Sequence, residues 1–240
     1  MKILVFGSTG MLGHKIINYL QAQDSVDVEF TVRNSGKQGI CKKIFGKKAR
    51  FIFEGNDPES ALDILCKYKP DFCINCLGII KQIDNPKNFL DYIKINSLLP
   101  HYLSSYCLKK NSRLIHISTD SVFSGMKGNY TEDDIPDPQD YYSRSKLLGE
   151  VHNKNDITIR TSIIGPEINN SKGLLEWLKS SGKTVNGYSN VLFSGFHCFD
   201  DFTRKSPLSG AAYLISPVLS ENASRSPEAS AGLQALYSHL

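Results

Sequence analysis

The strongest constraint on the fold is a set of evenly spaced glycines that directly follows the first apolar run of the chain. Residues 3–6 read Ile-Leu-Val-Phe, and Gly7, Gly10 and Gly13 come next, where an amphipathic segment begins. A G-x-x-G-x-x-G turn between a strand and a helix is typical of folds that bind dinucleotides. Gly7 would permit the tight turn, Gly10 would let the backbone approach a pyrophosphate, and Gly13 would let the helix pack closely on the strand.

The free N–H groups at the start of such a helix favour phosphate groups. Glycines are also common in ordinary turns, but this set lies at the strand-to-helix junction that the dinucleotide motif requires. We therefore predict a cofactor site that contains Gly7, Ser8, Thr9, Gly10, Met11, Leu12 and Gly13.

Short apolar runs alternate with segments of helical periodicity along most of the chain. The pattern predicts strands at 3–6, 26–32, 50–53, 72–76, 114–118 and 157–160. It predicts helices at 12–20, 61–68, 89–108 with an interruption at Pro100, and 142–152. Strands that alternate with helices indicate an α/β fold with a Rossmann-like, doubly wound parallel sheet.

The end of the second predicted strand indicates which dinucleotide is bound. An acidic residue there would hydrogen-bond the ribose of NAD, whereas an arginine accommodates the extra phosphate of NADP. This strand ends in Arg33, with Lys37 nearby, while Asp27 and Glu29 lie too early in it. The sequence favours NADP(H); the alternative is that Arg33 is an ordinary surface charge.

Three polar residues form a candidate catalytic set. Tyr142 and Lys146 lie one helical turn apart, and Thr119 ends the fifth predicted strand, at the edge where such sheets bind ligands. A phenol has a pKa near 10, and a nearby ammonium would lower it, so that the tyrosine could protonate a carbonyl oxygen as hydride arrives. Tyr106 and Lys110 match the same spacing, but they precede the fifth strand and fall at its opposite edge.

Composition excludes several other classes of function. The net charge of +4 is mild and the basic residues are scattered, so we expect no nucleic-acid partner. No segment is long and apolar enough to span a membrane, and we expect a cytoplasmic protein with six reduced cysteines. Cys73 and Cys76 would point to opposite faces of a strand, which argues against a shared metal. His116 is expected to be a hydrogen-bonded strand residue, and no metal site is predicted.

Several segments in register resemble the dTDP-4-dehydrorhamnose reductase family, which belongs to the extended short-chain dehydrogenases. The resemblance covers roughly residues 1–195 and is carried by 75–82, 117–125, 128–134, 142–150, 160–165 and 187–195. It implies a Rossmann domain, a smaller C-terminal substrate lobe, and reduction of a nucleotide-activated 4-keto sugar for polysaccharide biosynthesis.

The resemblance also implies roles for individual residues. Tyr142 would be the proton donor, Thr119 would complete the catalytic set, and Lys146 would also hold the nicotinamide ribose. Besides Arg33, inferred above from its strand end, the cofactor would contact Cys76, Leu77, Gly78 and Asn96. The sugar nucleotide would contact Lys81, Ser121, Val122, Phe123, Arg160, Thr161 and Ser162.

The chain departs from the family pattern after Gly195, and its composition changes close by. Alanine occurs at three positions before residue 205 and at six after it, where serine is dense and lysine is absent. We expect an NADP-binding domain at 1–165, an incomplete substrate lobe at 166–204, and an atypical tail at 205–240 that buries too little apolar surface to order itself.

Two other functions stay open. An incomplete lobe would also fit a non-catalytic, NADP-binding regulatory subunit. A third reading is an epimerase or dehydratase that retains tightly bound NAD, against which Arg33 argues. The protein could also form a homodimer.

Overall fold

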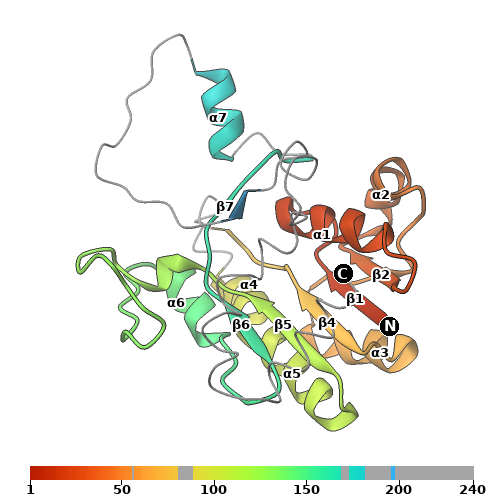
Figure 1. Cartoon of the computed structure of the whole chain (residues 1–240), viewed down its shortest axis with the longest axis horizontal. Coiled ribbons are helices and arrows are strands. Elements are labelled where there is room, and N and C mark those ends of the chain that lie inside the picture. Colours follow the sequence, from red (N-terminus) through yellow and green to blue (C-terminus); the bar gives the residue numbers. More distant parts are fainter. Residues whose placement is uncertain (56, 81–88, 169–172, 182–195, 198–240) are drawn as a thin grey trace.

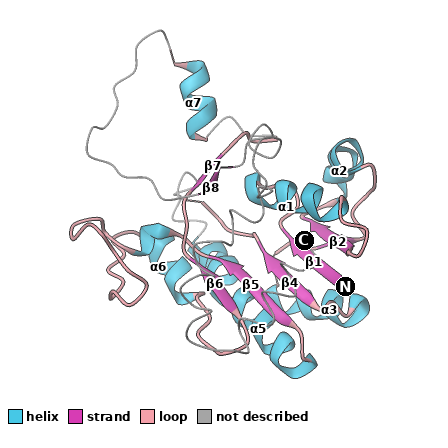
Figure 2. Ribbon diagram, in the orientation of Figure 1, coloured by secondary structure: helices cyan, strands magenta, loops and turns pink. Residues whose placement is uncertain are grey.

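A computed structural model describes residues 1–55, 57–80, 89–168, 173–181 and 196–197. Its centre is a sheet of six parallel strands in the order β3-β2-β1-β4-β5-β6, which is the doubly wound Rossmann order (Figures 1 and 2). These strands are β1 (Lys2–Phe6), β2 (Asp27–Val32), β3 (Phe51–Ile52), β4 (Phe72–Asn75), β5 (Arg113–Ile117) and β6 (Ile157–Ile159). The predicted fold class is confirmed.

Helices lie on both faces of this sheet (Figure 1). The longer ones are α1 (Met11–Gln21), α2 (Gln38–Phe45), α3 (Ala61–Tyr68), α5 (Leu99–Lys110) and α6 (Tyr141–Leu148). Short turns of helix are η1 (Ser35–Lys37), η2 (Pro58–Ser60), α4 (Phe89–Asp91) and η6 (Asp120–Val122). A second, two-stranded sheet pairs β7 (Ile163–Ile164) with β8 (Phe196–His197), and α7 spans Leu174–Ser180.

The alternation of side chains along β1 divides the core into two clusters. Ile3 and Val5 pack with Ile17 of α1 and with residues of α2, while Leu4 and Phe6 pack with residues of α3 and α5. All four β1 side chains are essentially inaccessible to solvent. Because β1 is buried on both faces, it is apolar at every position from 3 to 6, as expected for a central parallel strand.

The helix predicted at 89–108 is not interrupted at Pro100. It runs from Phe89 to Lys110 through α4, the π-helical segment η5 (Tyr92–Leu98) and α5, and Pro100 lies in the first turn of α5. Proline removes a backbone donor and its ring crowds the preceding turn. The wider π-turn immediately before Pro100 accommodates both effects, so the helix changes type and does not break.

Two further differences have local causes. The sequence pattern did not predict α2, which is short, contains Gly39, and buries only Cys41 and Phe45. Helix α6 ends at Leu148 and not at 152, because Gly149 lies directly against the helix beside it. A Cβ atom at Gly149 would lie 1.8 Å from the backbone oxygen of Asn96.

Along the described ranges, no helix combines the length and the apolar character needed to cross a bilayer. In Figure 1, β7 and α7 lie beyond the carboxyl ends of the central strands. The predicted boundary between the NADP-binding domain and the substrate lobe, at residue 165, falls directly after β7. Most of the predicted lobe, 166–204, and all of the tail, 205–240, lie outside the described residues.

Candidate functional site

The glycine loop between β1 and α1 has the close contacts that its motif predicts. Gly7 has a φ of +91°, and a Cβ there would lie 3.1 Å from the backbone of Cys76 and of Leu77. A Cβ at Gly13 would lie 2.2 Å from the carbonyl oxygen of Gly7. Gly10 precedes α1 in an extended conformation, and no side chain caps the helix. The first N–H groups of α1 are therefore not satisfied by a cap, which suits an anionic ligand.

Not every predicted loop residue offers its side chain to a ligand. Ser8 is buried, and its hydroxyl donates to the carbonyl oxygen of Thr31 in β2 at 2.8 Å. Leu12 packs into the core, while Thr9 and Met11 are half-buried. Ser8 and Leu12 therefore shape the loop with their side chains and could meet a cofactor only through the backbone.

Arg33 lies directly after β2, at the carboxyl edge of the sheet, and is exposed. β2 is the neighbour of β1, so this edge also carries the glycine loop. The position is the one at which Rossmann folds discriminate between NAD and NADP.

The three residues of the predicted catalytic set come together. Thr119 follows β5 and caps η6, where its hydroxyl accepts from the N–H of Ser121 at 3.2 Å. The Tyr142 side chain, from the first turn of α6, is hydrogen-bonded to that of Thr119. Lys146 is 3% exposed, and its ammonium donates to the carbonyl oxygen of Ile117 at 2.6 Å. A Cβ at Gly78 would lie 4.0 Å from the same nitrogen, so the loop after β4 meets this set.

The electrostatics of the set correct one expectation. Burial raises the pKa of Tyr142, the hydrogen bond from Thr119 opposes that rise, and Asp120 and Asp140 add to it. The expected lowering of the Tyr142 pKa is not found in the free protein, because burial outweighs the opposing hydrogen bond from Thr119. The Lys146 ammonium is directed to the backbone of Ile117. Burial lowers the pKa of Lys146 itself to about 8, against the opposing effects of Glu150 and Cys76.

Asn96 of η5 joins two parts of the site. Its side-chain oxygen accepts from the N–H of Ile79 at 2.8 Å, and its amide donates to the carbonyl oxygen of Ile79 at 3.0 Å. The same amide donates to the hydroxyl of Ser145, which donates to the carbonyl oxygen of Tyr142. Asn96 therefore ties the loop after β4 to α6, and its side chain is occupied by protein partners.

The residues predicted to contact the sugar nucleotide are only partly free to do so. Val122 is fully buried, whereas Ser121 is exposed and Phe123 is half-buried. The hydroxyl of Thr161 donates to the carbonyl oxygen of Ser162, and the hydroxyl of Ser162 donates to Asp120. Lys81 lies outside the described residues.

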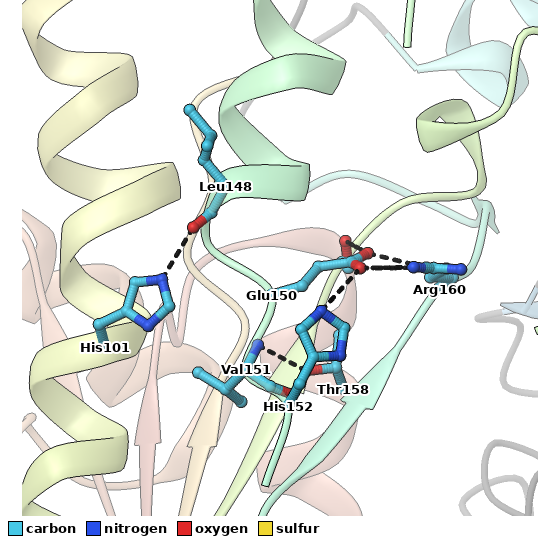
Figure 3. Close-up of polar contacts among 8 residues, drawn as sticks. His101, Leu148, Glu150, Val151, His152, Thr158 and Arg160 are labelled. Atoms are coloured by element: carbon cyan, nitrogen blue, oxygen red, sulfur yellow. Dashed lines mark hydrogen bonds and ion pairs between the residues drawn. The ribbon is translucent and has the colours of Figure 1, made fainter. Parts of the chain in front are cut away.

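Arg160 is held by a residue that the sequence analysis did not single out. Glu150 accepts from Nε and Nη2 of Arg160, at 2.9 Å and 2.7 Å, in a two-pronged ion pair (Figure 3). The guanidinium lies 5.1 Å from the ring of Phe123, which stacks on Tyr130. The signal for Glu150 was its position shortly after Lys146, just beyond the end of α6.

Two expectations about single residues have different outcomes. Tyr106 is buried in α5, where its hydroxyl donates to the carbonyl oxygen of Leu65 at 2.9 Å, away from the carboxyl edge of the sheet. His116 is only half satisfied: Nδ1 pairs with the amide of Asn75 at 3.1 Å, and Nε2 is buried with no partner in the described structure. Its pKa is well below the usual value because of burial, with the Lys146 charge adding to the effect.

The cysteines lie as predicted. Cys73 packs in one core cluster and Cys76 against the other, on opposite faces of the sheet. The five cysteines in the described ranges are free thiols, and Cys198 lies outside those ranges. Within the same ranges, no group of His, Cys, Asp or Glu side chains is arranged to hold a metal ion.

Comparisons with known proteins agree with this geometry. A family described as the RmlD substrate binding domain matches residues 1–182. The probable low-salt glycan biosynthesis reductase Agl14 of Haloferax volcanii is 30% identical over 151 residues, which are 62% of this chain and 48% of that protein. The spore coat polysaccharide biosynthesis protein SpsK of Bacillus subtilis is 30% identical over 171 residues, which are 67% of this chain and 52% of that protein.

A solved structure has the same sequence identity to this chain, 30%, as these two relatives. The crystal structure of a hypothetical dTDP-4-dehydrorhamnose reductase from Sulfolobus tokodaii matches with a TM-score of 0.57 and 30% identity, over 70% of this chain and 58% of that one. The chain thus spans about half the length of these curated relatives. It belongs to the RmlD family, the family of the dTDP-4-dehydrorhamnose reductases.

Proposed function

We propose that this protein is an NADP(H)-dependent reductase of a nucleotide-activated 4-keto sugar, with Tyr142 as the proton donor. The observation that carries the proposal is the meeting of Thr119, Tyr142 and Lys146 at the sheet edge that also bears the glycine loop. A protein that only binds a nucleotide has no need of this second group of side chains.

The residues around the glycine loop fit a dinucleotide. The close contacts at Gly7 and Gly13 leave no room for a side chain, so the loop presents only backbone at these two positions. No side chain caps the start of α1. These uncapped N–H groups would hold the pyrophosphate. Arg33 would pair with the additional phosphate of NADPH, which favours this cofactor over NADH.

The chemistry of the site follows from two hydroxyl groups. When bound, NADPH supplies the hydride for the carbonyl carbon. The hydroxyls of Thr119 and Tyr142 would donate to the carbonyl oxygen, and Tyr142 would pass its proton to the developing alkoxide. Lys146, one helical turn along α6, would stabilise the resulting phenolate and hold the nicotinamide ribose.

The proposal is tested by NADPH oxidation with dTDP- and UDP-linked 4-keto sugars. Replacing Tyr142 by Phe should lower kcat by about 10²-fold or more, because the proton donor acts mainly in the transition state. The affinity for NADPH, measured by calorimetry, should hardly change.

Tyr106→Phe is the matched control. It removes one buried hydroxyl that bonds to Leu65, so it should cost roughly 1 kcal/mol of stability and leave the rate unchanged. Loss of activity in Tyr106→Phe would contradict the placement of the site. Tight NADPH binding without turnover of any keto-sugar nucleotide would favour the regulatory-subunit alternative, and purification with bound NAD would favour the epimerase or dehydratase.

A further inference from the structure

His14 is a buried residue at the end of the first turn of α1, and it directly follows the last glycine of the loop. Its Nδ1 atom lies 2.9 Å from the carbonyl oxygen of Gly10. A carbonyl oxygen can only accept a hydrogen bond, so Nδ1 carries a proton and is the donor. An imidazole with a proton on a defined nitrogen is thus bonded to the glycine loop.

The carbonyl oxygen of Gly10 accepts two hydrogen bonds from His14. Besides the imidazole, the backbone N–H of His14 donates to it at 3.2 Å. This backbone bond is the first of α1, so the carbonyl points along the helix and away from its N-terminal end. Both lone pairs of the oxygen are then engaged within the helix. An anion at the N-terminal end therefore faces N–H groups and not this carbonyl oxygen.

A second carbonyl group connects the two ends of the loop. The N–H of Gly10 donates to the carbonyl oxygen of Gly7 at 3.1 Å. The same oxygen is packed against Gly13, since a Cβ there would lie 2.2 Å from it. The peptide groups on both sides of Gly10 are thereby fixed, although glycine itself has few conformational restrictions. Among these contacts, the bond from His14 is the one that a side chain makes, so a substitution can remove it.

We infer that His14 is a positioning residue for the cofactor: its imidazole holds the Gly10 peptide so that the uncapped N–H groups at the start of α1 face the pyrophosphate of the dinucleotide. The inference rests on the proposed function for the identity of the ligand, a dinucleotide, and not for the reaction. Preorganisation of this kind raises affinity, because the loop loses less freedom when the ligand binds. The role of His14 is therefore measured by binding, without a sugar substrate.

Two substitutions separate the hydrogen bond from the space that the imidazole fills. In His14→Asn the amide nitrogen is attached to Cγ, as Nδ1 is in histidine, and can still donate to Gly10. In His14→Leu the side chain stays bulky and has no donor. Loss of this one hydrogen bond should weaken NADPH binding about three- to tenfold in His14→Leu, as measured by calorimetry. His14→Asn should bind NADPH nearly as tightly as the wild type.

Adenosine 2′-monophosphate distinguishes positioning of the loop from a general loss of structure. Its phosphate would pair with Arg33, but it has no pyrophosphate and does not depend on the start of α1. It should therefore bind the wild type, His14→Asn and His14→Leu equally well. Equal weakening of this ligand and of NADPH in His14→Leu would show that His14 only stabilises the domain, and would overturn the inference.

The position of the imidazole proton is tested in the free protein. NMR of ¹⁵N-labelled histidine side chains should show a proton on Nδ1 of His14, with the signal assigned by its absence from His14→Asn. A ring protonated at Nε2 alone would overturn the inference, because such a ring cannot donate to Gly10.

The binding results also separate the inference from the proposed function. NADPH affinity that is unchanged in His14→Leu, or equally reduced in both variants, would overturn the role of His14 and leave the cofactor assignment in place. Tight NADPH binding that depends on His14, without turnover of any keto-sugar nucleotide, would support the role of His14 and contradict the proposed reaction. A wild type that binds no dinucleotide would contradict both.

Discussion

Arg33 and Ser8 lie on neighbouring strand ends, yet only one of them can distinguish cofactors by its side chain. The hydroxyl of Ser8 is bonded to Thr31 inside the protein, so it contributes through the shape of the loop. Arg33 is exposed at the carboxyl edge of β2, and no other described side chain bonds to it. Its guanidinium is therefore available to an anionic group.

Replacing Arg33 by Ala should weaken NADPH binding about tenfold to a hundredfold and NADH binding hardly at all, because a charge-assisted hydrogen bond contributes roughly 1.5–3 kcal/mol. Calorimetry with both cofactors measures the two affinities. Lys43→Ala is the matched control, since Lys43 is an exposed cation in the last turn of α2. Equal weakening of NADPH and NADH would show that Arg33 does not select the cofactor.

At the scale of elements, the sequence predicted those strands and helices that have a clear local pattern of apolar residues. The six strands of the central sheet were found within one or two residues, because the buried runs are apolar and bounded by polar turns, whereas β7 and β8 were not predicted. Helix α2 was missed because its apolar positions are few, and the change to a π-helix before Pro100 has no signature in periodicity. Packing against Gly149 and the bonds of Asn96 help to fix where that segment lies, and neither can be seen in the sequence.

The packing of α1 on the glycine loop gives a prediction at this scale. In Gly13→Ala the new Cβ would meet the carbonyl oxygen of Gly7 at 2.2 Å, and this oxygen belongs to the backbone, which cannot rotate away as a flexible side chain could. Overpacking of this kind should cost about 1–3 kcal/mol of unfolding free energy, measured in urea, and should weaken binding of the dinucleotide.

Gly39→Ala is the contrasting change within α2. Nothing lies within 4 Å of a Cβ at this position, so alanine should stabilise the protein by about 0.5–1 kcal/mol through its helix propensity. Equal stability of the Gly13 and Gly39 variants would mean that the loop can relax around a side chain.

At the scale of the whole molecule, the meeting of Thr119, Tyr142 and Lys146 was predictable because Thr119 lies at a strand end and the other two at helical spacing. The polar groups that support it were not, since they meet only in the folded chain. Asn75 pairs with His116, Ser118 with Glu150, and Asn96 with Ser145, each across elements that are distant in sequence. Periodicity can indicate which face of an element is buried, but it does not predict which buried polar groups pair.

The buried imidazole of His116 makes the stability of the molecule depend on pH. Its pKa is well below the ordinary 6.5 in the folded protein, mainly through burial, whereas the unfolded chain titrates near 6.5. The unfolded state therefore binds the extra proton first, so the contribution of His116 to stability is present above pH 6.5 and is lost as the pH falls. Between pH 7.5 and 5.5 this loss amounts to about 1.4 kcal/mol.

The loss is measured from urea unfolding of the wild type and of His116→Gln at both pH values. Glutamine is chosen because its side-chain oxygen can still accept a hydrogen bond from the amide of Asn75. All other titrating groups are common to the two proteins, so the difference between their pH dependences isolates His116. The variant should lose about 1.4 kcal/mol less than the wild type on acidification. Parallel losses would mean that the imidazole takes up a proton inside the fold, where its free Nε2 would then have found a partner that stabilises the charged ring.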